Sequence, residues 1–180
     1  MSQSAYAIGH QQPDTDTIIS AIALARLKRA QGGDVVAGRA GELNPETEFV
    51  LERWGVDAPT LLEDATDAEL LLVDHNEYSQ TVSGAREATI TQVVDHHRIG
   101  DVTTGDPISF RAEPVGSTGT ILTGLYDEAG VDIDEETAGL LLSGLLSDTV
   151  VLRSPTTTDT DREVAERLAE IAGVDSEDYG

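Results

Sequence analysis

Residues 68–74 of the chain read AELLLVD, in which an apolar run ends at an aspartate. A short continuous apolar run is typical of a strand that is buried on both faces of a parallel sheet. Residues 88–95, ATITQVVD, form a similar stretch and also end at an aspartate. These two stretches favour an α/β fold, provided that helices alternate with the strands.

Such an alternation runs along the rest of the chain. Residues 4–9 and 34–38 have the character of short strands, and residues 15–33 between them carry apolar residues at helical spacing up to two glycines. Asn44 and Pro45 suit the N-cap and the first position of the next helix. The remaining predicted elements are that helix over 44–55, an edge strand over 108–114, and helices over 117–129, 134–147 and 159–172, the last closed by Gly173.

The predicted architecture is therefore an α/β fold with a doubly wound, mainly parallel sheet flanked by helices. Its 180 residues suit one domain over residues 1–180. Cysteine is absent, which excludes disulfides, thiolate catalysis and zinc–thiolate sites. No apolar run approaches the roughly 18 residues of a membrane span, and the start of the chain lacks the pattern of a signal peptide, so we expect a cytoplasmic protein.

The net charge of −23 is the strongest feature of the composition. It would repel nucleic acids and anionic membranes, so we expect neither as a partner, and a polyanionic substrate would need metal ions. Lysine occurs only at Lys28, and acidic residues lie along the whole chain. This distribution is typical of a halophilic protein, with an acidic protein from a low-salt organism as the alternative.

The four histidines all follow predicted strands, and aspartates accompany them. The histidines are His10, His75, His96 and His97, and the aspartates are Asp14, Asp16, Asp74 and Asp95. In an open parallel sheet, ligands bind outside the carboxyl ends of the strands, so these loops should converge on one crevice. Taken singly, each residue has a simpler explanation as a helix cap, a turn former or a surface histidine. Together they are improbable as an ordinary solvated surface.

Clustered carboxylates repel one another unless cations neutralise them. Oxygen-rich sites with one or two imidazoles favour Mn²⁺, Mg²⁺ or Co²⁺. A carboxylate that bridges two such ions about 3.5–4 Å apart would allow a shared water to become a hydroxide that attacks phosphorus. A phosphoester or phosphoanhydride is the natural target.

Four ordered motifs resemble those of the DHH phosphoesterase superfamily, and of its manganese-dependent family II inorganic pyrophosphatases in particular. The motifs are GHQQPDTD (9–16), VDHNE (73–77), VDHH (94–97) and LLSGLLSDTV (141–150). The stretches RAEPVGSTGTIL (111–122), LRSPTTTDTD (152–161) and AEIAGVDSEDYG (169–180) also resemble pyrophosphatase sequence. The resemblance therefore covers nearly the whole chain.

This resemblance implies the roles of individual residues. One cation would be held by His10, Asp14 and Asp74. A second would be held by Asp16, Asp74, His96 and Asp148, so that Asp74 bridges the two. His97 would face the substrate, and Asp95 would orient the histidines from behind. His75 would lie near the substrate or behind the ligands, and we group it with His97 and Asp95 as a candidate catalytic residue.

The implied function is hydrolysis of pyrophosphate by a hydroxide between two divalent cations, with Mn²⁺ preferred and Co²⁺ or Mg²⁺ as alternatives. Family members carry a C-terminal domain that supplies lysine and arginine to the substrate, and these 180 residues contain no counterpart of it, so we expect weak or lost activity. A DHH phosphodiesterase that acts on short oligonucleotides or cyclic dinucleotides is the alternative enzyme, although acidity and an aromatic content of 4% disfavour it. An inert, self-associating metal-binding domain is the other alternative. The family also implies a homodimer, with the sheet edge near 108–114 as a candidate interface.

The acidic surface predicts a strong dependence of stability on salt. Screening in concentrated KCl shortens the Debye length to about 3 Å at 1 M, which weakens the self-repulsion of the folded chain. We expect the melting temperature to rise steeply between about 0.1 and 2 M KCl in a thermal melt. A flat dependence over that range would contradict the halophilic interpretation.

Overall fold

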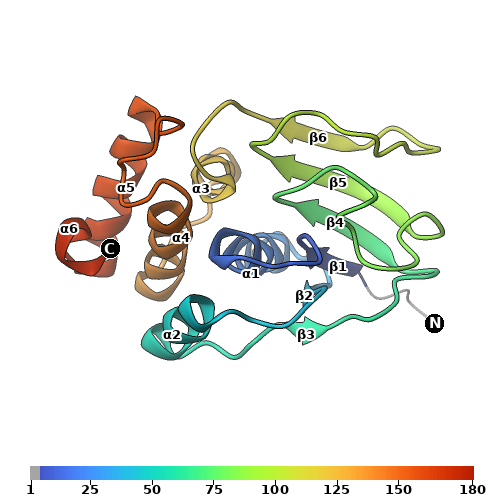
Figure 1. Cartoon of the computed structure of the whole chain (residues 1–180), viewed down its shortest axis with the longest axis horizontal. Coiled ribbons are helices and arrows are strands. Elements are labelled where there is room, and N and C mark those ends of the chain that lie inside the picture. Colours follow the sequence, from blue (N-terminus) through green and yellow to red (C-terminus); the bar gives the residue numbers. More distant parts are fainter. Residues whose placement is uncertain (1–4) are drawn as a thin grey trace.

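A parallel sheet of six strands organises the computed structural model, which describes residues 5–180 except for the side chain of Glu177 (Figure 1). The strands lie in the order β3-β2-β1-β4-β5-β6, and every neighbouring pair is parallel. They are β1 (Ala5–Ile8), β2 (Val35–Arg39), β3 (Thr60–Leu61), β4 (Glu69–Val73), β5 (Thr89–Asp95) and β6 (Ser109–Ala112). The predicted α/β fold with a parallel sheet is confirmed.

Five of these strands agree with the sequence prediction to within two residues at each end. Ser4, the first residue of the predicted strand 4–9, lies outside the described residues. The predicted edge strand is confirmed, because β6 is the last strand on its side of the sheet. β3 was not predicted: it has two residues, too few to show any periodicity.

Six helices complete the described part of the chain. They are α1 (Thr15–Ala30), α2 (Pro45–Trp54), α3 (Thr118–Ala129), α4 (Glu135–Asp148), α5 (Asp159–Ala172) and α6 (Ser176–Tyr179). The Asn44 side chain accepts a hydrogen bond from the Thr47 amide and caps α2, while Gly173, with a φ of 67°, ends α5. Both signals were correct, whereas the single-turn α6 was not predicted. None of the described helices combines the length and the apolar character needed to cross a membrane.

The two faces of the sheet are buried by different kinds of structure. On one face Ala7, Leu71 and Val94 belong to the large core formed with the helices, and α1 lies between the sheet and α4 (Figure 1). On the other face a smaller core contains Ile8 and Leu72, which pack with residues of the turns between β4 and β5. Both faces are buried, as the apolar runs predicted, but turns rather than helices cover the second face.

The winding of the sheet changes direction at β1. From β1 the chain proceeds to β2 and β3 on one side, and then returns to β4, β5 and β6 on the other. A crevice forms outside the carboxyl ends of two strands at such a switch point, because their loops leave in opposite directions. The loops after β1 and β4 therefore border the position where a ligand is expected.

The packing of α4 on α2 generates a test of the core. Gly139 lies in α4, and a Cβ atom there would overlap the Trp54 indole, which is 9% exposed and is fixed by a 2.8 Å hydrogen bond from Nε1 to the Tyr179 hydroxyl. Helix propensity alone would make Gly139→Ala stabilising by about 1 kcal/mol. Because of the overlap, we expect a loss of about 2 kcal/mol in the free energy of unfolding, measured with urea.

Gly124 provides the matched control, because it lies in α3 and nothing lies within 4 Å of its added Cβ. Gly124→Ala should stabilise the protein by about 0.5–1 kcal/mol. If both variants gain stability equally, the close contact between Gly139 and Trp54 is not a constraint.

Candidate metal centre

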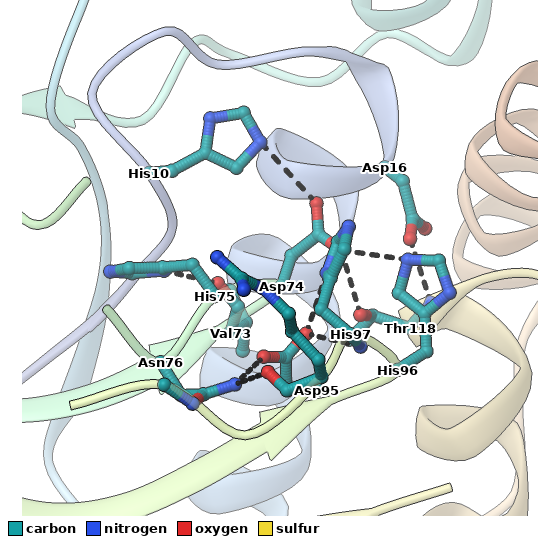
Figure 2. Close-up of polar contacts among 12 residues, drawn as sticks. His10, Asp16, Val73, Asp74, His75, Asn76, Asp95, His96, His97 and Thr118 are labelled. Atoms are coloured by element: carbon teal, nitrogen blue, oxygen red, sulfur yellow. Dashed lines mark hydrogen bonds and ion pairs between the residues drawn. The ribbon is translucent and has the colours of Figure 1, made fainter. Parts of the chain in front are cut away.

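The predicted site residues converge at the carboxyl ends of the central strands (Figure 2). His10 follows β1, and Asp14 and Asp16 lie at the start of α1. Asp74 and His75 follow β4, Asp95 ends β5 and precedes His96 and His97, and Asp148 is the last residue of α4. Two groups of possible metal ligands that share Asp74 match the predicted sets: His10, Asp14 and Asp74 in one, and Asp16, Asp74, His96 and Asp148 in the other. A third possible group combines Asp74 with His96 and His97.

Asp74 lies at the centre of the site and is 1% exposed. Its φ of 62° is in the left-handed region, which aspartate tolerates better than most residues. Thr118 Oγ1 donates to one carboxylate oxygen at 2.9 Å, and Thr17 Oγ1 donates to the other at 2.6 Å. Burial disfavours the charged carboxylate, but interactions with His10, His96 and Thr17 outweigh burial and hold the pKa of Asp74 below its usual range. Asp74 therefore stays ionised although it is buried.

The first group surrounds His10, which we call the His10 group. The Nε2 atom of His10 lies 3.4 Å from Asp14 Oδ2 and 3.6 Å from Asp74 Oδ2. Asp14 also caps α1, because its other oxygen accepts from the Thr17 amide at 2.9 Å. Burial lowers the pKa of His10, but the two carboxylates outweigh it and raise the pKa to about 10. In the absence of a cation, a proton on His10 thus balances these carboxylates.

The second group is the more buried, and we call it the His96 group. Asp16 is fully buried, and burial followed by repulsion from Asp148 and Asp74 raises its pKa. The Nε2 atom of His96 lies 3.4 Å from Asp74 Oδ1 and 3.3 Å from Asp148 Oδ2. Burial opposes a charged His96, but the neighbouring carboxylates raise its pKa to about 11. Three carboxylates therefore share one histidine as their source of positive charge within this group.

His96 shows directly that this group fits a metal ion. Its Nδ1 atom is 3.0 Å from the Val115 carbonyl oxygen, which can only accept, so Nδ1 carries the hydrogen. Its Nε2 atom is buried and has no hydrogen-bond partner among the described residues. A buried polar atom without a hydrogen-bond partner is costly, and once Nε2 loses its proton a cation among these carboxylates would accept its lone pair.

Asp95 and His97 form a pair beside the His10 and His96 groups, and His97 Nδ1 also lies 3.8 Å from Asp74 Oδ1. Asp95 is fully buried and accepts from both the amide and the Nδ1 of His97, at 3.1 and 2.8 Å. The Asn76 side chain donates to the other oxygen of Asp95. The hydrogen bond that His97 donates to Asp95 raises the pKa of His97, whose side chain is 51% exposed. His97 Nε2 is thus the nitrogen left for a bound molecule.

His75 is buried, and both of its ring nitrogens are bonded to protein. Nδ1 lies 2.9 Å from the Val73 carbonyl oxygen, and Nε2 lies 3.0 Å from Thr81 Oγ1. Burial lowers the pKa of His75, and its Nδ1 donates to the Val73 carbonyl, which can only accept. Neither nitrogen is available to a substrate in this arrangement.

Several supporting residues were not identified from the sequence. Thr17, Asn76, Ser117 and Thr118 all hold site carboxylates. Serine, threonine and asparagine are common at helix starts and in turns, so their presence in VGSTGT, in VDHNE and directly after GHQQPDTD did not distinguish this role from capping. Ser117 does both: it caps α3, and its hydroxyl donates to Asp16 at 2.8 Å.

Two cavities open beside the groups. One, of about 340 Å³, is lined by His10, Gln11, Gln12, Ser79 and Gln80. The other, of about 90 Å³, is lined by His75, Asn76, Glu77, Gln80, His97 and Arg98. Arg98 is the only lysine or arginine in either lining, and it already pairs with Glu77 at 2.7 Å. The chain itself thus offers an anion little positive charge here.

The chain is similar to known pyrophosphatases over almost its full length. The manganese-dependent inorganic pyrophosphatase of Methanothrix thermoacetophila is 48% identical over 181 aligned positions, which cover 100% of this chain and 58% of the relative. A probable manganese-dependent inorganic pyrophosphatase of Oceanobacillus iheyensis is 51% identical over 173 residues, 96% of this chain and 56% of the relative. The chain therefore spans a little under three fifths of the length of these relatives.

Solved structures agree with this similarity. The crystal structure of a Methanococcus jannaschii protein assigned to the family II inorganic pyrophosphatases matches with a TM-score of 0.90 and 44% identity, over 97% of this chain and 59% of that chain. An exopolyphosphatase-related protein of Bacteroides fragilis matches with a TM-score of 0.72 over 98% of this chain and 54% of that chain, but at 17% identity it supports the fold alone. The model of the DHH family, N-terminal domain, matches residues 4–145. Because this match covers well over half of the sequence, the chain belongs to the DHH family and carries its N-terminal domain.

Proposed function

We propose that this chain is the catalytic domain of a divalent-metal-dependent inorganic pyrophosphatase, which hydrolyses pyrophosphate to two phosphates. The observation that carries the proposal is the sharing of one ionised aspartate, Asp74, by two groups of metal-ligating side chains. The curated relatives named as manganese-dependent inorganic pyrophosphatases support the choice of substrate and of Mn²⁺. Co²⁺ and Mg²⁺ suit the same mixture of carboxylate and imidazole ligands.

Two cations would be held by the His10 and His96 groups, with Asp74 common to both. When bound, they would supply Lewis-acid stabilisation of phosphoryl oxygens and would lower the pKa of a coordinated water. Thr17 and Thr118 orient Asp74 through one hydrogen bond to each oxygen. The Val115 carbonyl fixes the tautomer of His96 so that Nε2 is presented to the group.

His97 is the best-placed residue of the chain for proton transfer. Asp95 accepts a hydrogen bond from its Nδ1 and raises its pKa, which favours the protonated form of His97. Its half-exposed ring borders the cavity of about 90 Å³. We propose that Nε2 donates this proton to the departing phosphate, or binds a phosphate oxygen, while buried Asp95 keeps the ring in place. His75 then supports the loop after β4 rather than the substrate.

The walls of the two cavities favour a small anion over a nucleotide. No aromatic residue other than the histidines lines them, so they offer no platform for a nucleobase. The alternative phosphodiesterase activity is therefore less well supported. An inert metal-binding domain remains the second candidate, because the relatives are considerably longer than the matched region.

We further propose that the protein is a cytoplasmic homodimer with a salt-adapted surface. The edge strand β6, with Phe110 40% exposed, is the candidate interface. Light scattering of the purified chain would measure its mass, and a monomer at high concentration would exclude this interface.

Phosphate release tests the proposed activity. With Mn²⁺ and pyrophosphate, the chain should release phosphate faster than free Mn²⁺ does. Asp74→Asn should lower that rate about 100-fold or more, because both groups lose their shared charge. Asp57→Asn, which replaces an exposed aspartate, is the matched control and should leave the rate unchanged. Preferential cleavage of a dinucleotide would support the phosphodiesterase alternative, and no turnover with Mn²⁺ bound would support the inert domain.

The binding of Mn²⁺ should depend on pH. The pKa values of His10 and His96 are raised to about 10 and 11 in the metal-free protein, so both are protonated at pH 7. Their ion pairs stabilise the metal-free fold fully below pH 6.5, and that contribution is lost as pH rises through 10 to 11. A cation must displace these protons, so the affinity of each group should rise about tenfold per pH unit between pH 6 and 8.

Calorimetry in buffers of different ionisation enthalpy would count the protons released. We expect about one proton per bound Mn²⁺. An affinity that stays constant from pH 6 to 8 would show that the histidines are not protonated ligands in the metal-free protein.

A further inference from the structure

Residues 115–120, which we call the α3 entry segment, contact three of the four members of the His96 group. The Val115 carbonyl accepts from His96 Nδ1 at 3.0 Å. The amides of Thr118 and Gly119 donate to the two oxygens of Asp16 at 2.7 and 3.2 Å. Ser117 Oγ also donates to Asp16, and Thr118 Oγ1 donates to Asp74 (Figure 2 shows Thr118 beside His96). The position of this segment therefore sets the positions of those three side chains.

Asp161 holds the α3 entry segment from the opposite side. It belongs to α5 and is fully buried. Its Oδ2 accepts from the Gly116 amide at 2.9 Å, and its Oδ1 accepts from Thr120 Oγ1 at 2.6 Å. The amide and hydroxyl of Thr158 also donate to Oδ2, each at 2.7 Å. One carboxylate thus joins the start of α5 to the start of α3.

Close packing around Gly116 restricts movement of the α3 entry segment relative to Asp161. A Cβ on Gly116 would lie 2.9 Å from Asp161 Oδ2 and 2.7 Å from the Thr149 side chain. Thr149 follows Asp148, the remaining member of the His96 group. Gly116 therefore packs closely against both Asp161 and the residue that follows α4.

We propose that Asp161 is a positioning residue for the His96 group. It contacts none of the predicted ligands, and acts by fixing the α3 entry segment, whose donors orient Asp16, Asp74 and His96. This inference rests on the proposed function in one respect only, the binding of a cation by the His96 group. The His10 group meets the α3 entry segment solely through Asp74, among the contacts of the described residues, so Asp161 should affect the two groups unequally.

The test is a calorimetric titration with Mn²⁺ alone, carried out on the whole chain and on its Asp161→Asn variant. An amide at residue 161 keeps one acceptor oxygen, but its NH₂ group cannot accept from the Gly116 and Thr158 donors. Because the variant makes fewer hydrogen bonds to the α3 entry segment, we expect the Mn²⁺ affinity of the His96 group to fall at least about tenfold. Loss of a residue that supports metal ligands typically has an effect of this size. The His10 group should change by less than about twofold. Asp14→Ala, which removes a ligand of the His10 group alone, identifies which binding step belongs to which group.

Two control variants separate positioning from general destabilisation. Asp127→Asn breaks the exposed pair between α3 and α5, Arg167 to Asp127 at 2.6 Å, without touching the α3 entry segment. Asp159→Asn removes an exposed acid from the same turn of α5. Both should leave the affinity of the His96 group unchanged, whatever they do to the melting temperature. If Asp161→Asn does not fold, Thr120→Val removes a single donor to Asp161 and should weaken the same step to a smaller degree.

A readout without metal is the NMR resonance of the His96 Nδ1 hydrogen, which reports the bond to Val115. The chemical shift of this hydrogen should differ from that of the wild-type chain in Asp161→Asn and should be unchanged in Asp127→Asn. Equal loss of affinity in both groups, or an unchanged His96 group in a folded Asp161→Asn, would overturn the positioning role. A wild-type chain that binds no second Mn²⁺ would instead refute the two-cation centre itself, and the NMR comparison would still decide whether Asp161 positions His96.

Discussion

The burial of carboxyl groups at the switch point of the sheet is the constraint on which the rest of the site depends. Asp74 is almost completely inaccessible to solvent, as are Asp16 and Asp95. An unpaired charge in such a place would be strongly destabilising, so each oxygen needs a donor. The structure supplies threonine hydroxyls, an asparagine amide, the first amides of α3 and histidine nitrogens.

The donors are not sufficient for the His96 group. Three carboxylates meet one histidine there, and the pKa of Asp16 and Asp148 is raised because burial and mutual repulsion oppose their charge. His96 Nε2 remains without a hydrogen bond among the described residues. A compact positive charge would relieve both problems at once, which is why the geometry itself favours a cation. Among the described residues, the ion pairs of Asp74 and Asp148 are made by histidines and not by lysine or arginine.

The sequence predicted the sheet and the convergence of the histidines because both depend on local patterns. The runs before Asp74 and Asp95 revealed buried strands, and parallel strands place their carboxyl ends together. Asp148 could not be found in this way, since it ends an apolar helix and has no histidine beside it; only family resemblance identified it. Asp161 was read as part of a helix start, and its partners Gly116 and Thr120 are about 40 residues away. Its contacts depend on how α3 and α5 pack, which no short window of sequence records.

The distribution of the site residues along the chain has a consequence for the stability of the folded state. From His10 to Asp148 they come from the ends of three strands, the start of one helix and the end of another. A cation held in both groups would close long loops of the polypeptide, and the entropy removed from the unfolded chain grows with the length of each loop. The protein has no cysteine with which to form a covalent link. Bound cations would therefore act for this chain as reversible cross-links. The more tightly they bind, the more they would stabilise the folded state.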